Sequence, residues 1–568
     1  MFRPRVERDE AQSMNKPDII VVGAGSAGAA VAARLSEDDT RRVLLIEAGM
    51  DTPPGDVPAD IRSIFPAAYF NGSYFWPNLT ASLRENESPV PFLQPRVMGG
   101  GSSVMGMIAL PGMPSDFDRW ERKGARNWSW NDVQPVFQSM IHDLDASPAT
   151  RNARGPNLVR RLPRERWPLY IKRIEDMAIA TPASTNIEST AEDRFFAAPL
   201  SQDDERAGSA RCYLTAEVRA RPNLAIMTDT RVLRVTIDRQ RVSGVLAEQG
   251  GELMTIAAPS VVVSCGAVSS PALLLRSGIG PAGELRALGI PVVVDRPGVG
   301  RNFQNHPQLH FAMTLKADGR LPSEAQHYIL AASRFSSGLE NCPTGDLFLY
   351  FTGRVSPKAF GPRMAMVAAA LYAPFSRGLV RLRSADPNTP PHVEQCLLSD
   401  PRDARRMILA ARRAEELLLA PSVRSCFDEI YLMPRRPPLK LINGSGLAGA
   451  LQATTATAVL AAPRLLRRLV LDAAIKPGRR IAHGIRNSPL TDKEILQASG
   501  AMFHPSSTCA IGAPEDSMAV VDAECRVYGV EGLRVADASV MPSIVSANTN
   551  MTTVMIGERV AGFIRRGN

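Results

Sequence analysis

Cysteine is scarce in this sequence. Seven cysteines are scattered singly along 568 residues, and no two of them form a Cys-x-x-Cys pair. An odd and dispersed set does not suit a disulfide framework or a zinc site, and it is typical of proteins in a reducing compartment. The first thirteen residues also lack the apolar core of a signal peptide. We therefore expect a cytoplasmic protein with no metal site.

A concentrated basic tract is also absent, although the net charge is +9. The basic residues are spread along the chain, many of them in doublets such as Arg41-Arg42, Arg160-Arg161 and Arg467-Arg468, with no interleaved aromatic residues. A nucleic-acid site would gather such charge into one patch or stripe. The pattern therefore favours a solvated basic surface and argues against nucleic acid as a partner.

The remaining composition is that of a globular protein, with 45% hydrophobic and 22% charged residues. A chain of this length is too long for one ordinary core. The length therefore predicts two or three lobes.

A nucleotide-binding turn is predicted close to the N-terminus. Residues 18–22 form a short apolar run typical of a buried parallel strand, and Gly23, Gly25 and Gly28 follow as Gly-x-Gly-x-x-Gly. The glycines permit a tight turn, the approach of a diphosphate and close packing of helix on strand. A helix of small residues beginning near Ser26 would then present its N-terminal N–H groups to the phosphate.

An acidic residue at the appropriate distance strengthens this prediction. Glu47 ends a second apolar run, nineteen residues after Gly28. An acid at this distance accepts hydrogen bonds from the ribose of a bound dinucleotide. FAD and NAD use the same turn, so these residues alone do not distinguish the two cofactors.

Several separated motifs further along the chain resemble, in the same order, those of the glucose–methanol–choline (GMC) family of oxidoreductases. They are RVMGGGSSVMGM at 96–107, VVVSCGAVSSPALLLRSGIGP at 261–281, GIPVVVDRPGVGRNFQNHP at 289–307, SRGLVRLRSADPNTPP at 376–391, FHPSSTCAIG at 503–512 and GLRVADASVMPSIVSANTNMTTVMIGERVA at 532–561. One such motif can arise by chance, whereas the ordered series is specific and covers nearly the whole chain. The resemblance implies FAD as the cofactor and the oxidation of an alcohol as the activity.

The resemblance also implies an α/β architecture with two domains. A discontinuous Rossmann-like FAD-binding domain would be assembled from residues 14–120, 210–316 and 499–568. Residues 121–209 and 317–498 would build an α+β substrate domain with an antiparallel sheet. The strand signals agree with this plan, and the alcohol would bind between the lobes.

The glycine-serine loop is the first predicted contact with the flavin. Gly99, Gly100, Ser102 and Ser103 give a backbone that can lie against a flat ring and offer N–H and hydroxyl donors to it. The alternative interpretation is a flexible surface loop. Asp537 follows a predicted strand, and it bonds the flavin's ribityl or phosphate region, caps the next helix, or does both. The resemblance adds these further cofactor positions: Val104, Val232, Cys265, Gly266, Ala538 and Thr549.

The predicted chemistry needs a base as well as a flavin, because oxidising an alcohol removes both a hydride and a hydroxyl proton. Histidine suits this role because its usual pKa is about 6.5. His504 occupies the catalytic position of the family, and Asn550 matches the position where the family places a second histidine or an asparagine. Asn550 would hold the substrate oxygen and orient its hydroxyl toward His504. His306 also lies in a motif, but we interpret its segment as structural.

Four departures from the family pattern bear on the cofactor and the substrate. Val104 stands where some members carry a histidine bonded covalently to the flavin, so we expect non-covalent FAD. Met105 replaces an asparagine beside the flavin, and Pro111 and the pair Ala510-Ile511 replace residues that include two arginines. The loss of these arginines weakens the case for a charged substrate.

An insertion at about 440–488 is longer than the family pattern requires. Its first apolar run, sixteen residues from Leu447, is too short to span a bilayer comfortably. Its second part is basic and amphipathic, with leucines at near-helical spacing. A lid over the active site, a peripheral membrane contact through 447–476 and a dimer contact all remain open.

The resulting hypothesis is the FAD-dependent oxidation of a primary alcohol, aromatic or moderately apolar, to the aldehyde. The preference for such a substrate rests on Phe503, Met105 and Met502 and on the absence of an anionic cluster for a quaternary ammonium group. Oxygen or another electron acceptor would reoxidise the flavin, and no residue distinguishes an oxidase from a dehydrogenase. The alternatives are a cyanohydrin lyase with a chemically idle FAD and a non-catalytic flavin-stabilised scaffold. The sequence does not fix the oligomeric state.

Overall fold

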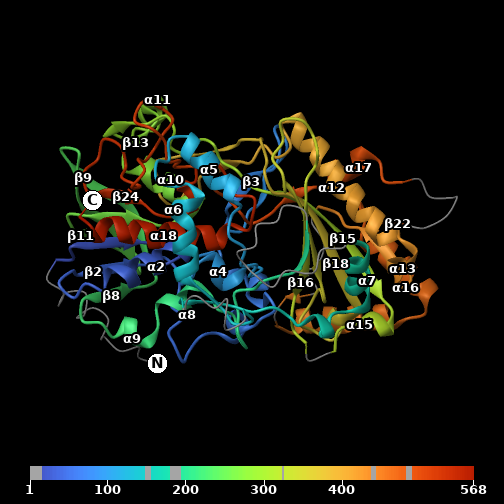
Figure 1. Cartoon of the computed structure of the whole chain (residues 1–568). Helices are drawn as coiled ribbons and strands as arrows, with labels where there is room; N and C mark the ends of the chain where they lie inside the picture. Colours follow the sequence, from blue (N-terminus) through green and yellow to red (C-terminus); the bar gives the residue numbers. More distant parts are fainter. Residues whose placement is uncertain are drawn as a thin grey trace.

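The computed structural model describes residues 16–146, 155–178, 194–322, 325–435, 443–444, 446–481 and 489–567. These residues form two lobes, one around a parallel sheet and one around a large antiparallel sheet (Figure 1). The segment 1–13, for which we expect no signal peptide, and parts of the predicted insertion lie outside the described residues.

The first lobe is built on a five-stranded parallel sheet. Its strands, in spatial order, are β24 (Leu533–Val535), β12 (Val261–Val263), β1 (Ile19–Val22), β2 (Val43–Ile46) and β8 (Leu224–Met227). Every pair is parallel, and the apolar runs of β1, β2 and β12 are buried throughout. Because these strands come from the start, the middle and the last part of the sequence, the predicted discontinuous Rossmann-like fold is confirmed.

Two helices far apart in sequence pack together beside this sheet (Figure 1). They are α2 (Ser26–Leu35) and α18 (Thr549–Arg565). A Cβ atom at Gly557 would lie 2.7 Å from the carbonyl oxygen of Ala27, so the two helices approach too closely for a larger side chain. The small residues of α2 therefore bring the nucleotide turn and the start of α18 close together.

Other elements complete the first lobe. An antiparallel sheet of β9 (Thr230–Asp238), β10 (Arg241–Gln249) and β11 (Glu252–Ala257) lies at its edge. Shorter elements are α3 (Ala59–Arg62), α4 (Gly101–Val104), α8 (Ser209–Tyr213), α9 (Ala216–Arg219), α10 (Gly266–Arg276), α11 (Ala282–Ala287), β5 (Ile141–Asp143), β6 (Asn157–Val159), β13 (Ile279–Gly280) and β14 (Val294–Asp295).

The second lobe is built on an eight-stranded sheet whose pairs are all antiparallel. Its order is β22 (Arg479–Ile481), β21 (Phe427–Leu432), β15 (Pro307–Leu315), β18 (Met364–Leu371), β17 (Leu347–Thr352), β16 (Ile329–Phe335) and β7 (Arg194–Ala197), with β23 (Gly500–Ala501) also pairing with β15. The predicted antiparallel sheet is therefore present. Helices α12 (Pro401–Leu419), α7 (Leu169–Ala178), α13 (Pro421–Arg424) and α17 (Asp492–Ala498) lie in this lobe (Figure 1).

Some segments pack with strands or helices other than those that the sequence suggested. Strand β15 lies within the range 210–316 expected for the FAD domain, but it pairs with β18 and β21 of the second lobe. The segment 376–384, expected in the substrate domain, contributes β19 (Leu379–Arg381) to a smaller sheet with β20 (His392–Glu394), β3 (Thr80–Ser82) and β4 (Val90–Pro91). Helices α5 (Pro114–Arg122) and α6 (Trp130–Met140) contact each other, and α6 also contacts α18 of the first lobe.

The insertion folds as a helical hairpin of α15 (Gly446–Ala461) and α16 (Arg464–Ala474). Its inner residues Ala453, Leu460 and Ile475 pack against the second lobe. Its outer surface carries exposed apolar side chains, namely Leu447, Leu451, Leu465, Leu466, Leu469 and Val470. No helix among the described residues is both long and apolar enough to cross a bilayer.

Candidate cofactor and active site

The turn after β1 adopts the geometry expected of a dinucleotide site. Gly23 has a φ of 98°, and a Cβ atom there would lie 2.6 Å from the carbonyl oxygen of Ser264. A Cβ atom at Gly28 would meet the carbonyl oxygen of Gly23 at 1.9 Å. Gly100 is equally confined, because its Cβ would lie 2.9 Å from the Cα of Gly25. The nucleotide turn and the glycine-serine loop are therefore in direct contact, and only glycine fits between them.

The carboxylate of Glu47 lies against this turn and accepts hydrogen bonds from backbone N–H groups. One of its carboxylate oxygens accepts a hydrogen bond from the N–H of Ala24, and the other accepts one from the N–H of Gly49, both at 2.9 Å. Burial raises the pKa of Glu47 to about 6. Each oxygen keeps a second lone pair, so the carboxylate can still accept ribose hydroxyls, as the sequence predicts.

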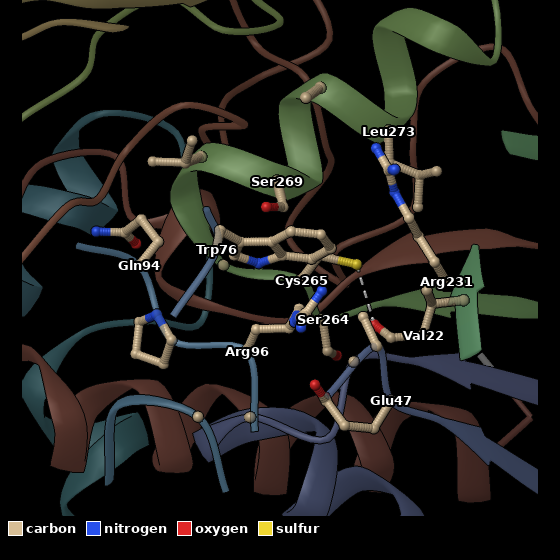
Figure 2. A pocket seen from close by; sticks show the side chains of 18 of the residues that line it. Val22, Glu47, Trp76, Gln94, Arg96, Arg231, Ser264, Cys265, Ser269 and Leu273 are labelled. Atoms are coloured by element: carbon tan, nitrogen blue, oxygen red, sulfur yellow. Dashed lines mark hydrogen bonds between the residues drawn. The ribbon is translucent and has the colours of Figure 1, made fainter. Parts of the chain in front are cut away.

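A cavity of about 550 Å³ opens above the turn and Glu47 (Figure 2). Most of the predicted cofactor residues line it, and these are Gly23, Gly25, Ser26, Glu47, Gly100, Val232, Cys265, Gly266, Asp537, Ala538 and Thr549. Gly28, Gly99, Ser102, Ser103 and Val104 do not line this cavity, although Ser102 lines the neighbouring one described below. Residues from widely separated parts of the sequence thus surround one cavity.

The hydroxyl groups of the serines in the glycine-serine loop form hydrogen bonds with backbone carbonyls. Ser102 Oγ donates to the carbonyl oxygen of Gly99 at 2.6 Å, and Ser103 Oγ donates to that of Met98 at 2.7 Å. The side chain of Val104 packs in a small apolar cluster with Phe75. These side chains hold the shape of the loop, whereas the sequence suggested that the serine hydroxyls face the flavin.

Asp537 caps the element that follows it, and its bond to the flavin stays a prediction. Its side chain accepts hydrogen bonds from the N–H of Ser539 at 2.7 Å and from the N–H of Gly266 at 2.9 Å, and Ser270 Oγ also donates to it. It therefore caps the short helix that follows, one of the two alternatives read from the sequence, and it lines the cavity as well. Burial raises the pKa of this carboxyl group.

The cavity also contains cations that the sequence did not indicate. Arg96 and Arg231 each place the guanidinium carbon 5.5 Å from the ring centroid of Trp76, whose indole reaches across the cavity (Figure 2). Arg276 lines the same space, and burial together with the nearby Arg231 lowers its pKa to about 10. The Nε atoms of Arg96 and Arg276 are buried without a hydrogen-bond partner among the described residues. The lining also includes the carboxylates of Glu47, Asp229, Glu248 and Asp537, so it is the two unsatisfied donors, and not an excess of positive charge, that fit the hydrogen-bond acceptors of FAD.

A second cavity of about 570 Å³ adjoins the first. Ser26, Gly101, Met105, Phe503 and Thr549 line both, so the two spaces meet at these residues. The second cavity is lined by aromatic side chains (Phe65, Tyr69, Phe70, Phe92, Tyr328, Tyr350 and Phe503), by methionines (Met105, Met107, Met366 and Met502) and by a few polar groups (Gln308, His310, Gln395 and Arg435). No carboxylate occurs among the described residues that line it.

His504 lies in the second cavity beside Asn548. The Nδ2 atom of Asn548 is 3.2 Å from His504 Nε2. Asn550 instead accepts a hydrogen bond from Ser26 Oγ at 2.7 Å, so the expectation that Asn550 would be the amide next to His504 is corrected. Helix α18 begins at Thr549 with Asn548 as its N-cap, and a residue two positions further along is turned about 200° around the helix axis.

Sequence reasoning also missed His306, whose ring contacts that of His504. His306 Nδ1 is 2.9 Å from His504 Nδ1, and His306 Nε2 is 3.1 Å from the carbonyl oxygen of Val545. The two histidines meet because the N–H of Met502 donates to the carbonyl of His306 next to the pairing of β15 with β23. Only this long-range pairing reveals the contact, and no local pattern in the sequence signals it.

Burial keeps both imidazoles neutral. It lowers the pKa of His504 to about 4, and it lowers the pKa of His306 well below its usual value, with a further contribution from His504. At neutral pH His504 therefore carries a lone pair on one ring nitrogen and can act as a base.

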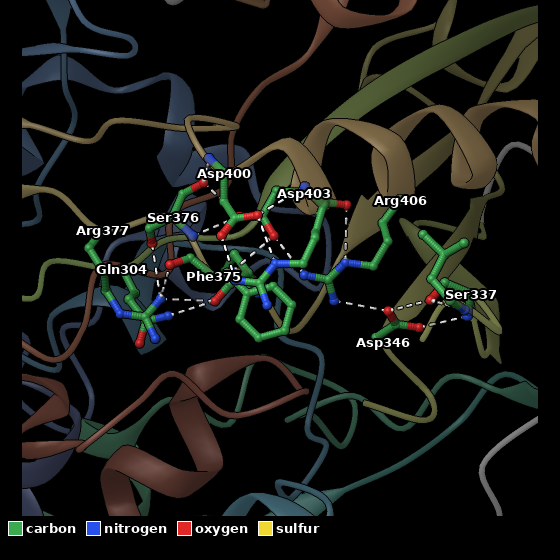
Figure 3. Close-up of polar contacts among 12 residues, drawn as sticks. Gln304, Ser337, Asp346, Phe375, Ser376, Arg377, Asp400, Asp403 and Arg406 are labelled. Atoms are coloured by element: carbon green, nitrogen blue, oxygen red, sulfur yellow. Dashed lines mark hydrogen bonds and ion pairs between the residues drawn. The ribbon is translucent and has the colours of Figure 1, made fainter. Parts of the chain in front are cut away.

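A buried ion network supports the loop behind this pair (Figure 3). Arg406 of α12 contacts Asp346 at 2.9 Å and Asp403 at 2.6 Å, and all three side chains are fully buried. Asp403 also accepts the N–H groups of Phe375 and Ser376. This loop is in turn tied to the segment before β15, because Gln304 Nε2 donates to the carbonyl of Pro374 at 2.9 Å. The network therefore fixes the segment that leads into His306.

Comparisons with known proteins decide the family. Residues 17–308 match the N-terminal model of GMC oxidoreductases, and residues 374–557 match the C-terminal model. The chain belongs to the GMC oxidoreductase family. The GMC resemblance, the fold class and the expected enzyme class, an FAD-dependent oxidase or dehydrogenase acting on CH–OH donors, are thereby confirmed.

Several relatives of this GMC oxidoreductase have assigned activities. A 5-(hydroxymethyl)furfural oxidase of Methylovorus sp. (strain MP688) is 35% identical over 568 residues, covering 96% of this chain and 98% of that protein. An oxygen-dependent choline dehydrogenase of Sinorhizobium fredii is 30% identical over 581 residues, covering 96% and 95%. The mitochondrial choline dehydrogenase of Homo sapiens is 30% identical over 592 residues, covering 98% and 91%.

Solved structures share the fold of this GMC oxidoreductase at lower identity. Pyridoxine 4-oxidase from Mesorbium loti has a TM-score of 0.78 at 24% identity, covering 97% of this chain and 99% of that one. A fungal aryl-alcohol oxidase has a TM-score of 0.72 at 21% identity, covering 98% and 99%. These similarities show that the fold is shared over nearly the whole chain.

Proposed function

We propose that this enzyme oxidises primary alcohols with an aromatic or moderately apolar body to aldehydes, with His504 as the catalytic base. The observation that carries the proposal is the contact of His504 Nε2 with Asn548 Nδ2 in an aromatic cavity that opens into the predicted cofactor cavity. FAD, when bound, supplies the acceptor for the hydride of the carbinol carbon. The predicted cofactor residues that line the first cavity would hold it.

His504 and Asn548 would deprotonate and bind the hydroxyl group of the substrate. His504 is neutral, and its Nε2 atom takes the hydroxyl proton. Asn548 donates from Nδ2, so it can hold the substrate oxygen as negative charge develops there. Asn548 thus takes the orienting role that the sequence suggested for Asn550.

The lining of the second cavity supports the choice of substrate. Its aromatic and methionine side chains suit an apolar ring, and its polar groups are neutral apart from Arg435. Arg435 is paired with Glu87 at 2.8 Å, so its charge is largely compensated. A quaternary ammonium substrate would find no carboxylate among the described lining residues. A furan or benzylic alcohol, like the substrate named for the Methylovorus relative, fits better than choline.

Anaerobic mixing of the FAD-loaded enzyme with a panel of alcohols tests this proposal. The flavin absorbance is expected to bleach with 5-hydroxymethylfurfural and benzyl alcohol and to change much less with choline. A cyanohydrin lyase or a non-catalytic scaffold would bleach with none of them. Bleaching with choline alone would overturn the substrate assignment. Admitting air then distinguishes an oxidase, which recovers its absorbance at once, from a dehydrogenase, which needs another acceptor.

We propose that FAD is held without a covalent bond. At the family's attachment position, Val104 offers no nucleophile, and its buried side chain lies among Tyr74, Phe75 and Val97. Acid precipitation of the protein is expected to release the whole flavin into the supernatant, where its absorbance is measured. Yellow colour retained in the washed pellet would contradict this.

We also propose a cytoplasmic enzyme that contacts an anionic membrane surface through the α15–α16 hairpin. None of the described hairpin residues lines the second cavity, which argues against a lid. The exposed leucines lie on the same elements as basic residues, and one carboxylate, Glu429, is shared by Arg464, Arg468 and Arg480. An apolar surface beside an excess of positive charge is typical of peripheral membrane binding.

Vesicle sedimentation tests this contact. Binding to vesicles containing phosphatidylserine is expected, with little binding to phosphatidylcholine alone. The triple substitution Leu465→Ser, Leu466→Ser and Leu469→Ser should abolish sedimentation, whereas Leu253→Ser, an equally exposed leucine on β11, should not. A concentration-dependent dimer that the triple substitution dissociates, without vesicle binding, would show a dimer contact instead.

A further inference from the structure

His306 and His504 meet through like atoms, the Nδ1 of each ring, at 2.9 Å. A hydrogen bond between two Nδ1 atoms requires one ring to donate and the other to accept. The direction of this bond decides where the proton of His504 lies, and therefore whether its Nε2 atom can act as a base.

The other nitrogen of His306 settles that direction. His306 Nε2 lies 3.1 Å from the carbonyl oxygen of Val545, which can only accept. His306 Nε2 must therefore carry the proton, and in a neutral ring its Nδ1 then has a lone pair and accepts. It follows that His504 donates from Nδ1, which leaves the lone pair of His504 on Nε2, the atom that faces Asn548 and the cavity.

The amide of Asn548 is oriented independently to match. Tyr372 donates its hydroxyl hydrogen to Asn548 Oδ1 at 3.1 Å, so the amide nitrogen is the end turned toward His504. The ring of Tyr372 stacks on that of His306, with centroids 4.5 Å apart and planes 15° apart. The three hydrogen bonds among these four side chains therefore agree with one set of proton positions, and the stacking of Tyr372 on His306 brings the first and last of them together.

Hydrogen bonds of Asn305 also hold the backbone around the two histidines. Asn305 Oδ1 accepts from the N–H of His306 at 2.9 Å and from the N–H of His504 at 3.1 Å. Asn305 Nδ2 donates to the carbonyl of Met502 at 2.7 Å. One buried amide thus holds the two segments at the separation that the imidazole contact requires.

We propose that His306 is a positioning residue that holds His504 in the tautomer protonated on Nδ1, so that Nε2 is always the basic atom. When His504 takes a proton on Nε2, its Nδ1–H continues to donate to the neutral His306, whereas the hydrogen bond from Asn548 Nδ2 to His504 Nε2 is lost and that amide N–H becomes available to the substrate oxygen. The pair accepts one proton and no more, because two charged imidazoles would oppose two N–H groups at 2.9 Å. The role of this arrangement in catalysis rests on the proposed function. The proton positions themselves follow from the contacts and do not depend on that function.

Two substitutions of His306 separate positioning from simple structural support. In His306→Asn the side-chain oxygen replaces Nδ1 as an acceptor, so the tautomer of His504 should be kept. In His306→Leu the acceptor is lost. We expect the rate of flavin reduction by a saturating alcohol to fall ~10²-fold or more in His306→Leu, the order seen when a catalytic histidine loses the residue that fixes its tautomer. His306→Asn should recover most of this loss.

Nitrogen NMR of the FAD-loaded enzyme labelled with ¹⁵N-histidine gives a readout that needs no substrate. The parent and His306→Asn should show His504 with a protonated Nδ1 and an unprotonated Nε2, and His306→Leu should show a shifted or mixed tautomer. The inference is overturned if the parent has its proton on Nε2, or if the tautomer is the same in all three proteins. If the tautomers behave as expected but no alcohol reduces the flavin, the proposed function fails and the inference stands.

Discussion

Tyr372 and Asn548, 176 residues apart, are joined by a hydrogen bond of 3.1 Å from the tyrosine hydroxyl to the amide oxygen. This bond leaves the amide nitrogen of Asn548 as the donor that faces His504. The orientation of the proposed substrate-holding group therefore depends on a residue at the end of β18, in the other lobe of the molecule.

Removing this hydroxyl should weaken catalysis without damaging the fold. In Tyr372→Phe the ring still stacks on His306, but Asn548 loses the bond that fixes its amide. We expect the rate of flavin reduction to fall about fivefold to tenfold, the equivalent of roughly one hydrogen bond. Stopped-flow absorbance measures the rate. Tyr170→Phe is the matched control, because its buried hydroxyl bonds the carbonyl of Thr352 away from the site, and its rate should equal that of the parent.

The two neighbouring asparagines should differ sharply. Asn548→Ala removes the donor next to His504, and we expect flavin reduction to slow by roughly 10²-fold at unchanged FAD content. Asn550 also lines the second cavity, but its side chain bonds Ser26 Oγ and not His504, so Asn550→Ala should change the rate less than about fivefold. Both values come from single-turnover mixing with the same alcohol. A larger effect for Asn550 would restore the role that the sequence suggested for it.

The pH dependence follows from the lowered pKa of His504. Because its pKa is about 4, the base is unprotonated, and therefore active, above that value, and it is lost as the pH falls through about 4. We expect kcat/KM for a benzylic alcohol to stay level from pH 8 to about 5 and then to decline. The FAD content at each pH serves as the control. A decline centred near 6.5, the usual value for histidine, would show that burial does not shift this group.

The ion network around Arg406 should matter for stability. Arg406→Met leaves the carboxylates of Asp346 and Asp403 buried without their cation, which costs about 3–5 kcal/mol of unfolding free energy. Arg413→Met is the control on the same helix, because its pair with Glu416 is exposed and contributes about 0–1 kcal/mol. Thermal unfolding followed by circular dichroism compares the two. Equal melting temperatures would mean that the network relaxes around the loss.

Much of the cofactor lobe could be predicted from the sequence, because the patterns that indicate it involve residues close together in the chain. Apolar runs beside a glycine turn predicted β1, α2 and β2, and Glu47 lies where the spacing placed it. The histidine pair could not be predicted in this way, because it depends on the pairing of β15 with β23, nearly two hundred residues apart. Asn548 and Asn550 share one motif, and only the position at which α18 begins decides which of them faces His504.

The parallel sheet is assembled from three distant stretches of sequence, and this affects when it can form during synthesis. Strand β24 completes the parallel sheet, and Asp537, Ala538, Thr549 and Thr553 in the segment after it line the cofactor cavity, so the lining is incomplete until this segment has been translated. We therefore expect flavin to bind only after this segment has been made, and a chain stalled before it would leave the edge of β12 unpaired and open to wrong partners.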